Sequence, residues 1–272
     1  MGMLNNFNNK SSNPKEELNL VHYNGKIGEF DYDADIWKLL KDFDGEYLHF
    51  EPKKDVSNLS LPKGLKSCRS MFEQCELPEG FTLTANFDTS EIVVMRNMFS
   101  YCKLPNGFSL GPNFDTSKVI KMGGMFSGCK LPEGFTLGDK FDVSNVDNML
   151  WMFAHAELPE GFTLGDKFNT SKVENMDSMF SCCKLPEGFT LGDLFDTSNV
   201  TNMRSMFDCC KIPKGFSLGD KFNTSKVESM DSMFAHCRFS EELDLGDLFD
   251  TSNASDGASA FVGCTINGRP GF

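Results

Sequence analysis

Apolar residues recur along most of the chain with a fixed period of 27 residues. The clearest marker is a Met-Phe pair, whose Met stands at positions Met71, Met98, Met125, Met152, Met179, Met206 and Met233. Ala260-Phe261 continues the same phase. A constant period of roughly 20–50 residues is typical of a solenoid, in which each unit buries its apolar side against its neighbours. The pattern therefore predicts a rod of stacked coils.

Within one unit, the pattern predicts a turn followed by a short strand. Residues 185–188 read Leu-Pro-Glu-Gly, with Pro second and Gly fourth, which suits a type I turn. Residues 189–191 then alternate apolar, polar and apolar side chains, as a half-buried strand does. Repeated in every unit, such strands would pair in parallel about 4.8 Å apart.

The other half of the unit predicts a helix. Asn169, Thr170 and Ser171 offer side-chain oxygens for a helix start, and Ser171 with Glu174 fits a capping box. The apolar residues that follow are Val173, Met176, Met179, Phe180 and Cys183. Their spacing gives one face of a helix of about three turns. We therefore predict an α/β repeat solenoid, with short parallel strands on one side and short helices on the other.

The first 60 residues follow no repeat and predict an α+β cap for the first coil. Residues 21–32 predict a hairpin that turns at Asn24-Gly25, residues 33–41 a short helix and residues 47–50 another strand. Residues before these are Asn-rich and polar, as in disordered tails. We divide the chain into a disordered tail (1–20), an N-terminal cap (21–60), a solenoid (61–264) and a C-terminal tail (265–272).

The net charge of −13 argues against direct binding of nucleic acid, which requires a basic surface. It is compatible with a solvated acidic surface or with a basic partner protein. No segment approaches the roughly 18 consecutive apolar residues that a membrane helix needs. The polar N-terminal residues contain no secretory apolar region, so we expect a cytoplasmic protein. A cell-surface location is the alternative if a signal peptide has been removed.

Seven of the ten cysteines hold one register of the repeat: Cys75, Cys102, Cys129, Cys183, Cys210, Cys237 and Cys264. Ala156 fills the missing place, which indicates a small, buried, apolar position. Because packed helices lie about 8–10 Å apart, thiols one repeat apart would be too distant for a bridge. We expect free thiols.

Residues 195–210 read Phe-Asp-Thr-Ser-Asn-Val-Thr-Asn-Met-Arg-Ser-Met-Phe-Asp-Cys-Cys, and this unit recurs with small variations. It resembles the BspA-like leucine-rich repeats of bacterial surface proteins, over residues 61–264. The resemblance implies a leucine-rich-repeat solenoid that binds proteins without catalysis, often as an adhesin. From the sequence as given, we expect no export signal, lipidated Cys or wall-sorting tail of the kind that such surface proteins carry. For members of the family without export signals, the resemblance implies a role inside a cell, for instance as effectors or inhibitors of a cytosolic protein.

Two ladders of acidic residues follow the repeat. Asp occupies one register at Asp88, Asp115, Asp142, Asp196 and Asp250, and Asn replaces it at Asn169 and Asn223. Helix capping explains both residue types, whereas a calcium site explains only the carboxylates. The second ladder is Asp139, Asp166, Asp193, Asp220 and Asp247. We interpret it as a solvated edge, with a docking rail for a basic partner as the alternative.

Nothing in the sequence indicates catalysis or a cofactor. The four histidines, His22, His49, His155 and His236, show no metal-ligand spacing. No phosphate-binding loop or nucleophile elbow occurs. A row of Met residues could suggest copper, but its spacing with Val and Phe favours core packing. We expect a non-enzyme without cofactor or metal.

Residues that break the repeat are the candidates for partner binding. Leu150 and Trp151 stand where other units have small or polar residues, and Tyr101 and His155 precede the Cys register. Exposed aromatic residues on a rigid surface favour a protein contact. We expect the partner to contact Leu150, Trp151, His155, Tyr101, Arg96 and Arg204. In the alternative interpretation, Trp151 fills a gap beside Gly123 and Gly124.

Two functions fit these observations. The first is an intracellular protein–protein interaction scaffold, for instance an inhibitor encoded by a mobile element that acts on a host protein with a basic surface. The second is a bacterial surface adhesin of the BspA-like type. The sequence does not identify the partner, the oligomeric state or the role of residues 1–60.

Overall fold

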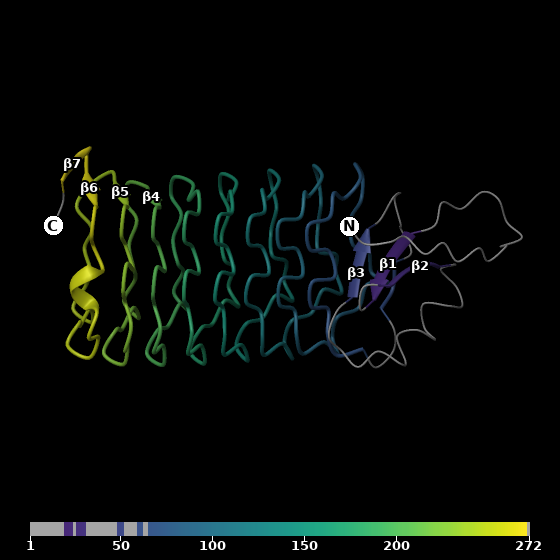
Figure 1. The fold of residues 1–272 in the computed structure, drawn as a ribbon, viewed down its shortest axis with the longest axis horizontal. Helices are drawn as coiled ribbons and strands as arrows, with labels where there is room; N and C mark the ends of the chain where they lie inside the picture. The colour runs from purple at the N-terminus through teal and green to yellow at the C-terminus, as the bar shows by residue number, and fades with distance from the viewer. Residues whose placement is uncertain (1–18, 24–25, 31–47, 52–58, 62–64, 271–272) are drawn as a thin grey trace, which may run out of the picture.

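The computed structural model describes residues 19–23, 26–30, 48–51, 59–61 and 65–270. From residue 65 onward the chain winds into narrow coils that lie side by side along the long axis of the molecule (Figure 1). Residues 27 apart therefore occupy equivalent places in neighbouring coils. Within the described residues, no helix has the length and apolarity needed to cross a bilayer.

Two ladders of parallel backbone bridges join the coils. One contains Asn148, Asn175 and Asn202, and the other contains Glu157, Lys184 and Lys211. The second ladder widens into short strands near the C-terminus: β4 (Lys211–Ile212), β5 (Arg238–Phe239) and β6 (Thr265–Ile266), with β7 (Arg269–Pro270) antiparallel to β6. Because ladder partners lie about 4.8 Å apart, the bridges fix a close spacing between coils.

Stacked phenylalanine rings fill the interior. Phe180 lies between Phe153 and Phe207, with ring centroids 5.6 and 5.5 Å away and ring planes tilted by 7° in both pairs. Phe189 meets Phe180 edge-on at 5.8 Å. All four side chains are buried. Each ring therefore gains its contacts from adjacent coils, which makes a single coil dependent on its neighbours.

The predicted helix is wrong, although its apolar residues are buried as expected. Ser178 and Cys182 both have a φ of 54°, in the left-handed region, which interrupts a right-handed helix. The N–H groups of Ser178 and Phe180 donate to the carbonyls of Arg204 and Met206 in the next coil, at 2.7 and 2.8 Å. A helix would use these donors internally and would need about 8–10 Å from its neighbour, which the closely spaced coils do not provide. The only helical element in the described residues is the 3₁₀ turn η1 (Gly257–Ser259).

The predicted strand at residues 189–191 is also misplaced. Phe189 and Leu191 are buried and Thr190 is exposed, as the alternation indicated, but the parallel bridges fall on Asn175 and Lys184. The turn before it lies one residue later than predicted, since the Phe189 N–H donates to the Pro186 carbonyl at 3.2 Å. Gly188 has a φ of 73°, which a type II turn requires at its third position.

Three strands precede the coils. The strands β1 (Asn19–Tyr23) and β2 (Lys26–Phe30) pair antiparallel, as the Asn24-Gly25 signal predicts. The strand β3 (Leu48–Glu51) pairs antiparallel with β1 and matches the strand predicted at residues 47–50. The helix predicted at residues 33–41 and most of the predicted disordered tail lie outside the described residues. The role of this segment as a cap remains a prediction.

The C-terminal end is more ordered than a tail. Part of the predicted tail forms β6 and β7, which extend the sheet from β5. Just before these strands, Asp256 contacts the preceding coil. Its Oδ1 accepts the Met230 N–H at 2.9 Å and its Oδ2 accepts the Ser229 hydroxyl at 2.7 Å. Equivalent N–H groups in earlier coils donate to a backbone carbonyl, as Met203 does to Ser229. At this end, a carboxylate therefore replaces the carbonyl.

Candidate functional site

The clearest candidate site is a groove of about 500 Å³ that crosses six coils, from Glu73 to Asp208. We call it the aromatic groove. Its lining comes from equivalent positions of successive coils: Glu73, Asn97, Ser100, Tyr101, Gly124, Ser127, Trp151, Ala154, His155, Ser178, Ser181, Ser205 and Asp208. Since five steps of about 4.8 Å separate its ends, the groove is roughly 24 Å long.

Two large aromatic side chains, Tyr101 and Trp151, line this groove and are exposed to solvent. The Tyr101 side chain is 56% exposed and the Trp151 side chain is 51% exposed, and His155 is also exposed. All three residues have a positive φ, between 54° and 58°. Trp151 and His155 stand four residues apart in one coil, and this two-fold left-handed pattern recurs in most coils. The backbone that replaced the predicted helix therefore positions the exposed rings.

Small residues form the base of the groove. Ser100, Ser127 and Ala154 line it and are buried. The Ser127 hydroxyl donates to the Ala154 carbonyl of the next coil at 3.2 Å. Larger side chains in this register would fill the groove, so its depth depends on these three residues.

The structure separates the six residues predicted to bind the partner into two groups. Tyr101, Trp151 and His155 share the aromatic groove, whereas Leu150, Arg96 and Arg204 do not line it. Leu150 is half-buried, and its Cδ2 lies 2.9 Å from the place that a Cβ on Gly123 would occupy.

The two arginines have different surroundings. Arg204 Nε lies 3.5 Å from a carboxylate oxygen of Asp231 in the next coil. Arg96 is half-buried, and its Nε has no hydrogen-bond partner among the described residues. Trp151 remains exposed and does not fill the expected gap, because Leu150 occupies the space beside Gly123 and Asn97 the space beside Gly124.

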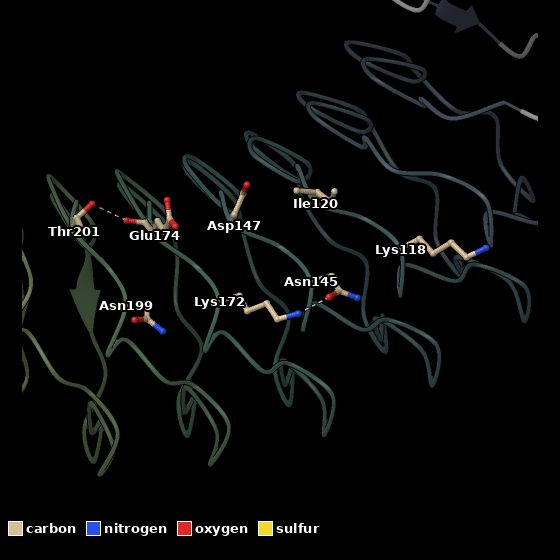
Figure 2. Close-up of a pocket in the computed structure, with 8 residues that line it drawn as sticks. All are labelled: Lys118, Ile120, Asn145, Asp147, Lys172, Glu174, Asn199 and Thr201. Atoms are coloured by element: carbon tan, nitrogen blue, oxygen red, sulfur yellow. Dashed lines mark hydrogen bonds between the residues drawn. The ribbon is translucent and has the colours of Figure 1, made fainter.

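A second groove, of about 770 Å³, is lined by charged and polar residues together with Ile120 (Figure 2). Its lining is Lys118, Ile120, Asn145, Asp147, Lys172, Glu174, Asn199 and Thr201. In Figure 2 the Lys172 side chain points to Asn145, where Nζ donates to Oδ1 at 2.6 Å. Asp147 pairs with Lys121 at 2.6 Å, and Lys118 pairs with Glu91. Asp147 and Lys118 thus have partners outside this groove and Lys172 has one inside it, so fewer charges are free for a ligand than the lining suggests.

The first Asp ladder closes turns and does not cap helices. Asp196 Oδ1 accepts the Ser198 N–H at 2.9 Å, and Asn223 Oδ1 accepts the Ser225 N–H at the same distance. This Asx turn needs an oxygen and no charge, which explains why Asp and Asn alternate. The second ladder, exemplified by Asp166, is exposed.

A family model covers the coils that carry both grooves. It matches residues 66–188 and 187–268, about three quarters of the chain, and its description is "Mycoplasma protein of unknown function, DUF285". The chain belongs to this DUF285 family. No curated protein and no solved structure matches the chain.

One group of residues in these DUF285 coils was missed by the sequence analysis. Cys182, Cys209 and His236 occupy one register of three successive coils, and Asp208 adjoins Cys209. This register directly precedes the buried Cys register in each coil. The doublets Cys182-Cys183 and Cys209-Cys210 carry the signal, because the residue before each buried Cys faces the surface side of the coil.

Four thiols of the buried Cys register donate hydrogen bonds to the preceding coil. Cys129, Cys210, Cys237 and Cys264 are free, and their Sγ atoms lie 2.8–3.0 Å from a Phe carbonyl oxygen one coil earlier. Burial raises the pKa of these thiols, for Cys129 to about 12. The prediction of free thiols is confirmed, but the distance argument behind it was wrong, because the thiols belong to closely spaced coils and not to packed helices.

Proposed function

We propose that this DUF285 chain is a non-catalytic scaffold that binds an extended, basic segment of a partner protein in the aromatic groove. The observation that carries the proposal is the exposure of Tyr101 and Trp151 within one groove on a rigid stack of coils. Tyr and Trp are the residues most enriched among those that dominate protein–protein binding energy.

The dimensions of the groove support an extended segment. Its length of roughly 24 Å matches about seven residues of extended chain at 3.3 Å each. The stacked phenylalanine core holds the coils in place before binding, so little conformational entropy is lost when the groove is occupied.

The charges support a basic segment. Glu73 and Asp208 stand at the two ends of the groove, and no Lys or Arg is among its described lining residues. The whole chain carries a net charge of −13, which attracts a basic partner from a distance. A Lys or Arg near each end of the segment would meet these carboxylates.

Selection from a random peptide library tests the proposal. The immobilised full chain should enrich seven-residue segments with a basic residue near each end. Truncating Trp151 or Tyr101 to Ala should weaken the selected peptides by about 2 kcal/mol, roughly 30-fold in Kd. Leu248→Ala serves as the matched control, since Leu248 is 45% exposed and lies outside the groove.

Enrichment of acidic segments, or selected peptides that bind the Trp151→Ala and Tyr101→Ala variants as tightly as the wild type, would overturn the proposal. Equal weakening by Leu248→Ala would show that the effect is not specific to the groove.

We further propose that the repeats are of the BspA-like leucine-rich type and that the partner is intracellular. The unit at residues 195–210 supports the first point by its resemblance. Buried free thiols such as Cys210 and Cys237 support the second, because thiols persist in reducing compartments. A surface adhesin is the alternative. Immunogold labelling of intact cells distinguishes the two, since surface labelling without permeabilisation contradicts an intracellular partner.

A further inference from the structure

Three potential metal ligands meet at the surface where the aromatic groove ends. The ligand atoms of Asp208, Cys209 and His236 lie within 4.8 Å of one another. Asp208 and His236 are joined directly, with 3.1 Å between Oδ1 and Nδ1. Cys182 occupies the place equivalent to Cys209 in the preceding coil, 27 residues earlier.

The fold holds these side chains in place. Cys182, Cys209 and His236 have φ angles of 54°, 60° and 57°, so the three share one backbone conformation in successive coils. The His236 ring lies over Gly263 of the next coil, where an added Cβ would come within 2.9 Å of Cδ2. The absence of a side chain at Gly263 therefore leaves room for the imidazole.

The set of ligand atoms is chemically selective. A thiolate sulfur, an imidazole nitrogen and a carboxylate oxygen are ligands of Zn²⁺, whereas Ca²⁺ and Mg²⁺ prefer oxygen alone. Ligand atoms in a tetrahedral zinc site lie roughly 3.3–3.8 Å apart, given metal–ligand distances of about 2.0–2.3 Å. Small side-chain rotations therefore suffice to bring Asp208, Cys209 and His236 around one ion.

A nucleophilic role for Cys209 fits less well. The Asp208 carboxylate lies beside the exposed Cys209 thiol, and a neighbouring negative charge disfavours the thiolate. A reactive cysteine needs a lowered pKa, because the thiolate is the nucleophile. The neighbouring carboxylate opposes that requirement but suits a cation.

We propose that Asp208, Cys209 and His236 form a surface binding site for Zn²⁺ or a similar thiophilic divalent cation, with Cys182 as the fourth ligand. On binding, the sulfur–metal bonds replace the S–H bonds of the two thiols, and both protons pass to solvent. The site shares one residue, Asp208, with the aromatic groove, whereas Cys182, Cys209 and His236 do not line the groove.

Titration with Co²⁺ tests the site, because cobalt reports thiolate coordination through a charge-transfer absorption. The full chain, kept reduced with a phosphine, should bind one Co²⁺ with this absorption and release it to one equivalent of Zn²⁺. Cys209→Ser and His236→Gln should each weaken binding at least tenfold. Asp166→Asn provides the control, since Asp166 is an exposed carboxylate outside the cluster and its replacement should leave metal binding unchanged.

Cys182→Ser examines the fourth ligand separately and should reduce the absorption per cobalt ion. Circular dichroism of each variant confirms that the coils remain folded. No thiolate–cobalt absorption in the reduced wild type, or an undiminished absorption in folded Cys209→Ser, would overturn the proposal.

Discussion

Thr170 and Asp196 exchange two hydrogen bonds across adjacent coils. The Thr170 hydroxyl donates to the Asp196 carbonyl at 2.8 Å and accepts the Asp196 N–H at 2.8 Å. Thr170 is completely buried. The same reciprocal pair joins Thr89 to Asp115, Thr116 to Asp142, Thr197 to Asn223 and Thr224 to Asp250. A buried hydroxyl therefore ties each of these coils to the next.

Replacing Thr170 by Val should lower the free energy of unfolding by about 1–3 kcal/mol, because the Asp196 N–H and carbonyl lose their partner in a buried place. Urea denaturation under reducing conditions measures the change. Val143 occupies this register in one coil naturally, and there the Asn169 N–H donates to the Lys167 carbonyl at 2.8 Å. Val143→Thr is thus the matched control and should not destabilise the chain. Equal loss in both variants would contradict the role of the hydroxyl.

Phe180→Ala should lower the free energy of unfolding by about 3–5 kcal/mol, because the substitution removes stacking on both neighbouring coils and leaves a cavity. The denaturation midpoint of the full chain measures this loss. Phe261, near the last coil, is only partly buried. Phe261→Ala should therefore cost less than Phe180→Ala, and the reverse order would argue against a continuous stacked core.

Asp196→Asn should change the free energy of unfolding by less than about 0.5 kcal/mol, because Asn169 already forms the same turn, with its Oδ1 accepting the Ser171 N–H at 3.0 Å. Asp196→Ala should cost about 1 kcal/mol, since the Ser198 N–H loses its acceptor. Thermal melting with and without added Ca²⁺ provides the check. Calcium-dependent stabilisation that disappears in Asp196→Asn would instead indicate a cation site.

Asp256 should make the C-terminal coils sensitive to acid. Partial burial opposes its ionisation, but hydrogen bonds from the Met230 N–H and the Ser229 hydroxyl outweigh this effect and lower the pKa of Asp256. Because the pKa of Asp256 is lower in the folded than in the unfolded chain, where it is about 3.9, the ionised carboxylate stabilises the fold at any pH above that value. This stabilisation is lost as the pH falls through the pKa of the folded chain. At pH 7, Asp256→Asn should therefore be less stable than the wild type by about 1 kcal/mol.

That difference should shrink as the pH falls below about 4, because the wild-type carboxylate is then protonated. Stability of both proteins across pH 2–8 gives the comparison, with Asp244→Asn as a control for a carboxylate that serves only its own turn, at Gly246. A constant difference between wild type and Asp256→Asn over this range would exclude the electrostatic explanation.

The period of 27 residues was sufficient to predict which residues are buried. Met179, Phe180 and Cys183 recur because identical layers must meet in successive coils, and this demand is visible in sequence alone. The Asp and Asn alternation likewise revealed an acceptor position, since both residues offer the same oxygen. Exposure of Trp151 followed from its being out of place in a polar row.

The path of the backbone was decided only by tertiary structure. Apolar positions three and four residues apart fit a helix. The short distance between bridged coils leaves no room for helices, and the N–H of Ser178 instead donates to the Arg204 carbonyl of the next coil. The left-handed φ of Trp151 and His155, and hence the groove, depend on that choice. Cys209 and His236 meet for the same reason, because a repeat places residues 27 apart side by side only when the coils are in register. Local pattern thus determined what is buried, and hydrogen bonding between coils determined the shape that buries it.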